Sequence, residues 1–292
     1  MQSNSPSDNT AVVIATIHGK VGLCTLNRPK RLNAWTDNMQ TQLYNALEEF
    51  ERDPRVSVIV VTGAGRGFCA GADLGNLDTL ASSTGPAVVP PPHTDSRSFL
   101  LPMYIHKPII AAVNGPVAGM GFGFALCCDM RFSNRKAKWC GAFSKRGLVA
   151  EWGTSFLLPR LIGTGNAMMM MMDSEVVLGE EAMRLGLVQK VFDGDCLAKT
   201  LLYAQQLANN VSPVSLAGIK RQIWTHPALD DDEALRQTVA LMRASLSTGN
   251  ADFKEGVKSF LEKRKPRFGS LDRKNPVLKT MQILMQGMPA KL

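Results

Sequence analysis

Two stretches rich in glycine and alanine follow short apolar runs of the chain. The first covers residues 62–73 after the run 56–61, and the second covers residues 114–123 after the run 108–113. A β-branched apolar run of this length predicts a buried parallel strand, and a helix is expected after each turn. Backbone N–H groups at a helix start lack partners within the helix, so each turn predicts an anion site. Two such turns at neighbouring parallel strands can each direct one N–H at a single oxygen and stabilise an oxyanion.

The glycine spacing argues against the common nucleotide-binding motifs. Gly63, Gly65 and Gly67 do not match the GxGxxG pattern, and no acidic residue ends a second strand about 20 residues later. Neither turn contains the GK[ST] sequence of a P-loop. The alternatives that the residues leave open are an anion or oxyanion site, and glycines that only permit tight packing of a helix on a strand.

The composition excludes several classes of protein. The chain has 292 residues, of which 45% are apolar and 20% charged, so we expect a folded protein with a large core. Its longest apolar runs, such as 109–113, are far shorter than the roughly 20 residues of a membrane span, and the N-terminus does not resemble a signal peptide. The six cysteines form no CxxC pair, and none has a histidine at ligand spacing. We therefore expect reduced thiols, mostly buried, and no metal site.

The positive charge is concentrated near the C-terminus. The net charge of +8 predicts an anionic partner: nucleic acid, a membrane surface or a phosphorylated small molecule. Residues 254–279 contain nine lysine and arginine residues against three acidic residues, which gives this segment +6 of the total. The cluster therefore predicts one local anion-binding segment rather than a basic surface over the whole protein.

The elements that position the two turns follow from the apolar pattern. Residues 11–17 and 21–26 predict a hairpin, and Thr36 is an expected N-cap of a helix that ends before Pro54. Residues 80–98 are rich in serine, threonine and proline and predict a long loop. After about residue 154 the period is helical, in residues 154–161, 168–172, 179–185, 197–208, 213–224, 234–246 and 252–263. Five consecutive methionines, 168–172, are interpreted as part of a buried helix.

Six segments then resemble one known family, in the same order and at the same spacing. They are TLNRPKRLNA (25–34), FCAGADL (68–74), AAVNGPVAGMGFGFALCCD (111–129), GL…LPRLIG (147–163), EEAMRLGLV (180–188) and EGVKSFLEKRKPRF (255–268). The chain resembles the crotonase superfamily of enoyl-CoA hydratases and isomerases over about residues 11–268. The resemblance implies an α/β fold: a crotonase-like spiral of ββα units with a C-terminal helical trimerisation region, in a homotrimer or a hexamer of stacked trimers. We expect a disordered N-terminus (1–10), a core (11–205), a trimerisation region (206–268) and a basic tail (269–292).

The resemblance also implies a coenzyme A thioester as substrate, with no permanently bound cofactor. The two oxyanion-hole N–H groups correspond to Ala72 and Met120, which would hold the thioester oxygen as an enolate forms. Other matched positions imply contacts with coenzyme A. These are Arg28, Lys30, Arg31, Ala70, Gly71, Asp73, Leu74 and Gly119, together with Lys263 and Phe268 in the segment that resembles one reaching a neighbouring subunit's substrate.

The expected acid–base residues differ from those of the family's hydratases. The positions of the two hydratase glutamates hold Gly123 and Phe143, and neither side chain can transfer a proton. Glu151 matches the single catalytic glutamate of some Δ3,Δ2-enoyl-CoA isomerases, and a 1,3-proton shift needs one base. The alternative for Glu151 is that it complements the dipole of the helix expected from about Thr154. The resemblance thus favours an isomerase over a hydratase, a thioester hydrolase or a C–C-cleaving enzyme.

Two further interpretations concern partners and location. Some relatives bind RNA, but Phe260 and Phe268 of the basic segment are better explained by packing than by base stacking, so nucleic acid is not the expected partner. No membrane association is expected either. The C-terminal Ala290, Lys291 and Leu292 are a conservative variant of the SKL peroxisomal signal, so we expect a cytoplasmic or a peroxisomal matrix location.

Overall fold

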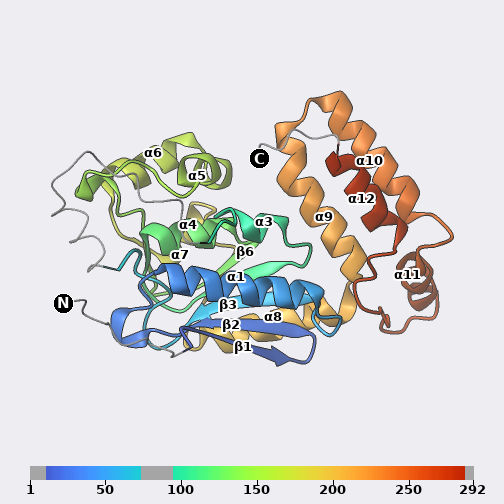
Figure 1. Cartoon of the computed structure of the whole chain (residues 1–292), viewed down its shortest axis with the longest axis horizontal. Helices are drawn as coiled ribbons and strands as arrows, with labels where there is room; N and C mark the ends of the chain where they lie inside the picture. The colour runs from blue at the N-terminus through green and yellow to red at the C-terminus, as the bar shows by residue number, and fades with distance from the viewer. Residues whose placement is uncertain (1–10, 74–94, 287–292) are drawn as a thin grey trace, which may run out of the picture.

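A six-stranded sheet forms the centre of the computed structural model, which describes residues 11–73 and 95–286 (Figure 1). Its strand order is β1-β2-β3-β4-β6-β9. The strands are Val13–His18 (β1), Val21–Leu26 (β2), Val58–Gly63 (β3), Ile109–Val113 (β4), Met130–Asn134 (β6) and Lys190–Phe192 (β9). β1 and β2 form an antiparallel hairpin, and the remaining pairs are parallel. The carboxyl ends of β2, β3 and β4 therefore lie at one edge of the sheet, which is where ligands bind in parallel sheets.

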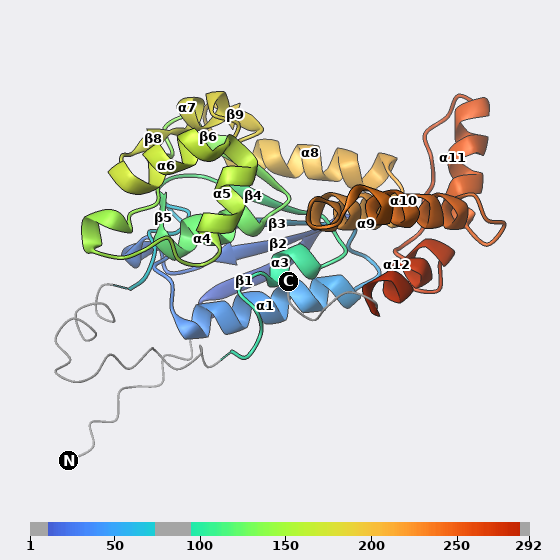
Figure 2. The same ribbon diagram turned by 90° about the horizontal axis from the view of Figure 1, so that it is seen from above.

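The sheet is covered by helices on both faces, which explains its continuous apolar strands. Val58 and Val60 of β3 pack with α8 (Cys196–Asn210), whereas Ile59 and Val61 belong to the cluster on the other face. That second cluster includes apolar side chains of α1 (Asp37–Arg52). Figure 2 shows α1 and α8 on opposite sides of the strands. Thr36 caps α1 by accepting a hydrogen bond from the Met39 N–H at 3.2 Å, as its sequence position predicts.

A smaller sheet and a group of short helices lie beyond the carboxyl ends of the main strands. The small sheet has the order β5-β7-β8, with strands Val117–Ala118 (β5), Lys138–Cys140 (β7) and Val177–Leu178 (β8). The helices of this part are Leu101–Tyr104 (α3), Gly119–Cys127 (α4), Thr154–Ile162 (α5), Thr164–Asp173 (α6) and Gly179–Arg184 (α7), with 3-10 turns Pro29–Arg31 (η1) and Ser144–Arg146 (η2).

The C-terminal helices form a separate layer at the other end of the molecule (Figure 1). They are Pro213–Thr225 (α9), Asp231–Ser245 (α10), Ala251–Leu261 (α11) and Pro276–Gln286 (α12), with the 3-10 turn His226–Ala228 (η3) after α9. α12 packs on α9 and α10 through Val277, Leu278 and Met281. No helix of the described ranges combines the length and the apolar character needed to cross a membrane.

Some details differ from the sequence predictions. β3 begins at Val58 rather than at residue 56, because the Val56 N–H closes a turn on the Asp53 carbonyl. The methionine run was predicted to be buried, which is wrong for Met168, Met169 and Met172: these side chains are exposed, whereas Met170 is buried. Part of the expected loop 80–98 and all of the N-terminal segment 1–10 lie outside the described residues. The predicted basic tail contains a helix, α12.

Candidate active site

Two glycine-containing segments run side by side beyond the carboxyl ends of β3 and β4. Cys69 pairs in parallel with Val117, and the Ala118 N–H donates to the Cys69 carbonyl at 2.9 Å. Ala72 and Met120 each follow this pair by three residues, and the glycines that precede them, Gly71 and Gly119, lie close to each other. The two residues expected to form an oxyanion hole therefore come from adjacent chain segments at the edge where the parallel strands end.

Glycines allow the two segments to approach closely. Gly71 and Gly119 both have left-handed backbones, with φ values of 97° and 51°. A Cβ atom added to Gly71 would lie 3.1 Å from the Ala118 carbonyl oxygen and 3.5 Å from the Gly119 Cα. Both glycines of the predicted coenzyme A set thus shape the hole through their backbones.

The N–H groups of Ala72 and Met120 are available for a ligand. Ala72 pairs in parallel with Trp35, whose N–H donates to the Gly71 carbonyl and whose carbonyl accepts from the Asp73 N–H. Because successive N–H groups of an extended chain point to opposite sides, the Ala72 N–H points away from Trp35. Met120 is the second residue of α4, where N–H groups have no helical partner. Within residues 11–73 and 95–286, neither N–H donates a hydrogen bond to a protein acceptor.

Glu151 lies on a tight turn that leads into α5. Trp152 and Gly153 both have positive φ values, 56° and 73°, and the Thr154 N–H and hydroxyl both donate to the Glu151 carbonyl. The Glu151 side chain is half-buried. Its Oε2 accepts a hydrogen bond from the Trp152 indole Nε1 at 3.1 Å. The carboxylate is thus held by its neighbour rather than placed on the first N–H groups of α5.

The turn that carries Glu151 packs against α4. A Cβ atom at Gly123 would lie 3.0 Å from the Trp152 Cβ. Gly123 follows Met120 by three residues on the same helix, so the turn that carries Glu151 packs on the face of α4 to which Met120 also belongs. Phe143, at the other position where a hydratase carboxylate was expected, is buried. The arrangement brings the turn of Glu151 and two N–H groups without backbone acceptors among the described residues to α4 and the segment beside it, a set that can remove a proton next to a carbonyl and stabilise the resulting enolate.

The residues predicted to bind coenzyme A fall into two groups. At the edge of the hole, Arg28 donates to Asp73 at 2.9 Å and to the Ala34 carbonyl, so this pair also braces the segment that carries Ala72. Lys30, Arg31 and Ala70 are exposed at the same edge of the sheet. Leu74 lies outside the described residues.

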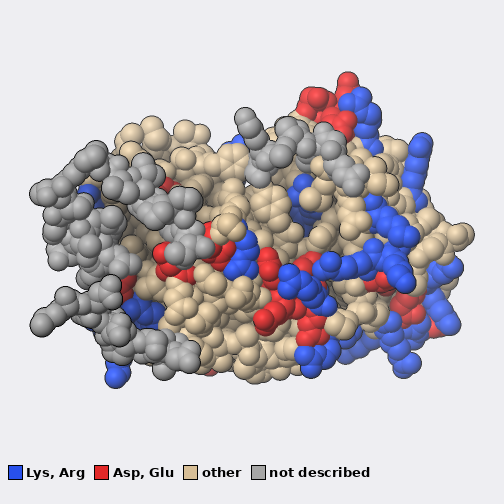
Figure 3. Space-filling model, viewed as in Figure 1, with Lys and Arg blue, Asp and Glu red and all other residues tan. Residues whose placement is uncertain are grey.

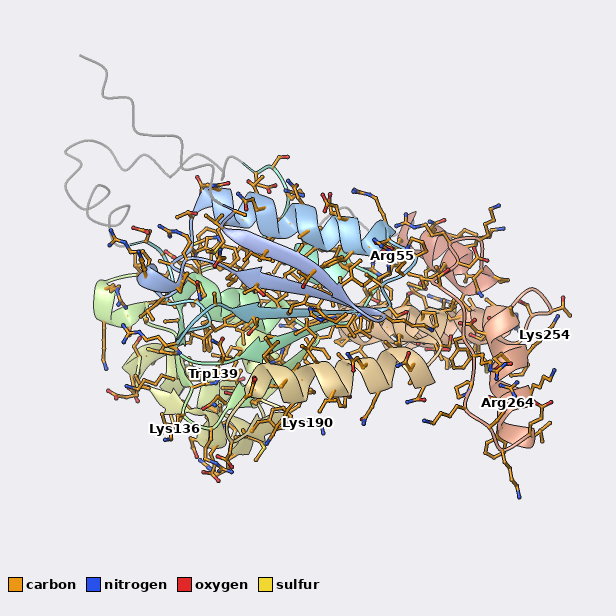
Figure 4. The ribbon with its side chains drawn as sticks, turned by 90° about the horizontal axis from the view of Figure 1, so that it is seen from below. Arg55, Lys136, Trp139, Lys190, Lys254 and Arg264 are labelled. Atoms are coloured by element: carbon orange, nitrogen blue, oxygen red, sulfur yellow. The ribbon has the colours of Figure 1, made fainter. Side chains whose placement is uncertain are left out.

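Lys263 and Phe268 lie at the opposite end of the sheet. The Phe268 carbonyl accepts from the Lys20 Nζ at 3.3 Å, and Lys20 belongs to the turn between β1 and β2, at the amino end of β2. Figure 1 shows α11 far from α4, and Figure 3 shows lysine and arginine side chains gathered over the C-terminal helices. In Figure 4, Lys254 and Arg264 lie at the end of the molecule remote from Trp139 of β7. The structure therefore does not bring Lys263 and Phe268 together with the other site residues of their own chain.

The aromatic residues around Glu151 were not predicted. Trp152 lies 5.0 Å from Phe99 between ring centroids, Phe99 lies 5.8 Å from Trp35, and Trp35 lies 5.5 Å from Phe124. The signal in the sequence was a tryptophan directly after the candidate base and a second one, Trp35, directly after the TLNRPKRLNA segment. In the described parts of the chain, no group of three or more histidine, cysteine, aspartate or glutamate residues is arranged to hold a metal ion.

Comparisons with known proteins agree with this geometry. A family model described as enoyl-CoA hydratase/isomerase matches residues 16–271. The 1,2-epoxyphenylacetyl-CoA isomerase of Escherichia coli is 38% identical over 88% of this chain and 97% of its own length. The short-chain-enoyl-CoA hydratase of Clostridium acetobutylicum is 32% identical over 87% of this chain and 95% of its own. The crystal structure of an enoyl-CoA hydratase from Polaromonas sp. JS666 superposes with a TM-score of 0.78 at 29% identity, covering 88% and 99% of the two chains.

Proposed function

Because the chain belongs to the enoyl-CoA hydratase/isomerase family, we propose that it moves the double bond of an enoyl-CoA thioester from the Δ3 to the Δ2 position. Glu151 is the base in this proposal, and the N–H groups of Ala72 and Met120 form the oxyanion hole. The observation that carries it is the turn of Glu151 packed on α4, with Gly123 and Phe143 at the positions where the family's hydratases are expected to have glutamates. One base suffices for a 1,3-proton shift, whereas adding water efficiently takes two carboxylates.

The reaction needs no group beyond those of the site. Glu151 removes a proton from C2 of the 3-enoyl thioester, and the carbonyl oxygen gains the negative charge of a dienolate. The two N–H groups stabilise that charge, each contributing about 3 kcal/mol if they resemble other oxyanion donors. Glu151 then returns the proton to C4, which leaves the double bond between C2 and C3. No water is consumed, and Glu151 ends in the charge state in which it began.

Replacement of Glu151 by glutamine tests the proposal. Wild type and Glu151→Gln are mixed with 3-enoyl-CoA and with 2-enoyl-CoA in deuterated water, and the products are followed by NMR. We expect wild type to form 2-enoyl-CoA, and Glu151→Gln to lower kcat by about 10³-fold. Glu175→Gln is the control, because Glu175 is exposed and pairs with Lys145. Rapid hydration of 2-enoyl-CoA by wild type, or full activity of Glu151→Gln, would contradict the proposal. Release of free coenzyme A would indicate a hydrolase.

An aromatic acyl group is a second candidate for the substrate. The half-buried rings of Phe99 and Trp152 lie beside the carboxylate, and the similar E. coli protein is named for an epoxide of an aromatic acyl-CoA. Apolar rings favour an apolar, planar acyl group. The same variants assayed with 1,2-epoxyphenylacetyl-CoA and with straight-chain 3-enoyl-CoA separate the two candidates by their kcat/KM ratio.

The proposal includes a homotrimer in which one subunit completes the site of another. Lys263 and Phe268 lie at the end of the sheet opposite to the hole of their own chain. α11 also exposes apolar side chains, with Phe260 83% and Leu261 73% exposed. A second copy covering this face would bury these side chains and bring the basic segment to its neighbour's substrate.

A further inference from the structure

We propose that Trp152 is a positioning residue for Glu151 and that its side chain excludes a second carboxylate from the site, which directs the enzyme toward isomerisation. This inference rests on the proposed function. It concerns one side chain that touches both the base and the helix of the oxyanion hole.

Trp152 directly contacts Glu151, the residue that precedes it in the chain. The Trp152 indole N–H donates to the Glu151 carboxylate at 3.1 Å. In an extended chain, neighbouring side chains point to opposite sides, so this contact needs a bend. The φ of 56° at Trp152 supplies it. A bulky residue in the left-handed region costs about 1 kcal/mol or more, and such conformations are retained mainly where the surroundings or the function require them.

The indole ring of Trp152 is held in place by an aromatic cluster. Its ring packs on Phe99, whose backbone carbonyl accepts a hydrogen bond from the Tyr44 hydroxyl at 2.9 Å. Phe99 packs in turn on Trp35, and the Trp35 backbone pairs with the segment that carries Ala72. The same aromatic cluster therefore ties the base to one side of the oxyanion hole. A donor that is fixed in this way holds the carboxylate in one orientation during both proton transfers.

Trp152 also limits the space for a side chain at position 123. A Cβ atom there would lie 3.0 Å from the Trp152 Cβ, 3.3 Å from the Trp152 carbonyl oxygen and 3.4 Å from Phe99 Cε1. Side chains are not accommodated at such distances unless a neighbour moves. Trp152 thus crowds the first side-chain atom of any residue at position 123, and a glutamate there would fit only if Trp152 or Phe99 shifted by a few tenths of an ångström.

The positioning role is tested by Trp152→Phe, which keeps an aromatic ring and removes the donor. We expect kcat for 3-enoyl-CoA to fall about 10-fold while KM stays within about twofold, because the lost hydrogen bond acts on the base and not on the bound thioester. Trp224→Phe is the matched control: its indole N–H donates to the Asp129 carboxylate at 2.7 Å, away from Glu151. A Trp152→Phe enzyme with the kcat of wild type would overturn the positioning role. If Glu151→Gln is itself fully active, the proposed function fails instead.

The exclusion role is tested by opening the space. Gly123→Glu and Trp152→Gly are made singly and together, and glycine suits the positive φ at position 152. We expect the double variant to convert 2-enoyl-CoA to 3-hydroxyacyl-CoA at least 10-fold faster than either single variant. A folded double variant that hydrates no faster than Trp152→Gly, or a Gly123→Glu variant that hydrates as fast as the double one, would overturn the exclusion role. Circular dichroism melts verify folding in each case.

Discussion

Gly71 brings the two segments of the oxyanion hole into contact, and an alanine at this position should separate them. Its φ of 97° disfavours any side chain, and a Cβ atom would meet the Ala118 carbonyl oxygen at 3.1 Å. We predict that Gly71→Ala lowers kcat by about 100-fold, as loss of one oxyanion donor does, and destabilises the protein by about 1–3 kcal/mol. Steady-state kinetics and urea unfolding measure the two effects.

Gly194 provides the control for that prediction. Its φ is 74°, but an added Cβ atom would meet no atom within 4 Å. Gly194→Ala should therefore cost about 1 kcal/mol for the left-handed backbone and leave kcat unchanged. Equal losses of kcat in the two variants would mean that backbone strain, not the geometry of the hole, explains the effect at Gly71.

The residues of the candidate site were predictable to different degrees. Ala72, Met120 and Glu151 were predicted from the resemblance to the family's motifs; in the structure, Ala72 and Met120 lie on adjacent segments, and the turn of Glu151 packs on α4. The role of Trp152 was not predictable, because its contact with Glu151 depends on a positive φ that no residue pattern reveals. The packing of Trp152 on Gly123 likewise joins positions far apart in the sequence.

Among the elements, α9 is attached to the core by a buried ion pair. The Lys220 ammonium lies 2.7 Å from the Asp129 carboxylate, which also accepts from the Ile109 N–H and the Trp224 indole. Both charged side chains are largely buried, so removal of Lys220 leaves the Asp129 charge buried without its ionic partner, with two hydrogen bonds from neutral donors. We predict that Lys220→Met lowers the free energy of unfolding by about 3–5 kcal/mol. Urea unfolding measures the change, and a loss below about 1 kcal/mol would contradict the prediction.

The turn after α11 is predicted to lose an electrostatic contribution in acid. Hydrogen bonds from the Arg264 guanidinium and the Arg267 N–H lower the pKa of Glu255 from 4.5 to about 2. A depressed carboxylate pKa stabilises the folded state above pH 4.5, and that contribution disappears as the pH falls toward 2. We therefore expect the difference in unfolding free energy between wild type and Glu255→Gln to be constant above pH 4.5 and to shrink below it. Urea titrations over this range measure it, and a difference independent of pH would argue against the role of Glu255.

Several of the longer strands were predicted from the sequence, whereas the two-residue strands were not. β3 and β4 were predicted because short apolar runs mark strands buried on both faces, and β2 was predicted as the second strand of a hairpin. β5 and β8 have two residues each, too few to show any period. α12 lies in the segment that was predicted as a basic tail from its charge, and its apolar residues pack on α9 and α10. The methionines of α6 were predicted to be buried because methionine is apolar. In a helix, however, consecutive side chains point in different directions, so only part of the run can face the core.

At the scale of the whole molecule, the two ends of the sheet separate two kinds of residue. The hole, Arg28 and Glu151 lie at the carboxyl ends of the parallel strands, and the basic segment that follows α11 lies beyond their amino ends (Figure 1). The fold with its C-terminal helices matches the solved relatives over 88% of the chain, which confirms the α/β architecture expected from the motifs. The sequence placed the charge in one segment, but only the fold shows that this segment faces away from the site of its own chain.

This separation leads to a prediction about mixed oligomers. If Lys263 binds the substrate of a neighbouring subunit, Lys263→Glu should raise KM about 10-fold by removing a charge-assisted contact with a phosphate. When the Lys263→Glu and Glu151→Gln variants are mixed and reassembled, activity at low substrate concentration should be regained. Some sites of the mixed oligomers then combine an intact Glu151 from one chain with an intact Lys263 from the other. We expect the activity of the mixture to exceed the sum of the two parents, measured alongside the oligomer mass by light scattering. If Lys263 acts only within its own chain, the mixture will show no more than the sum of the two parents, because no site then combines the two intact residues.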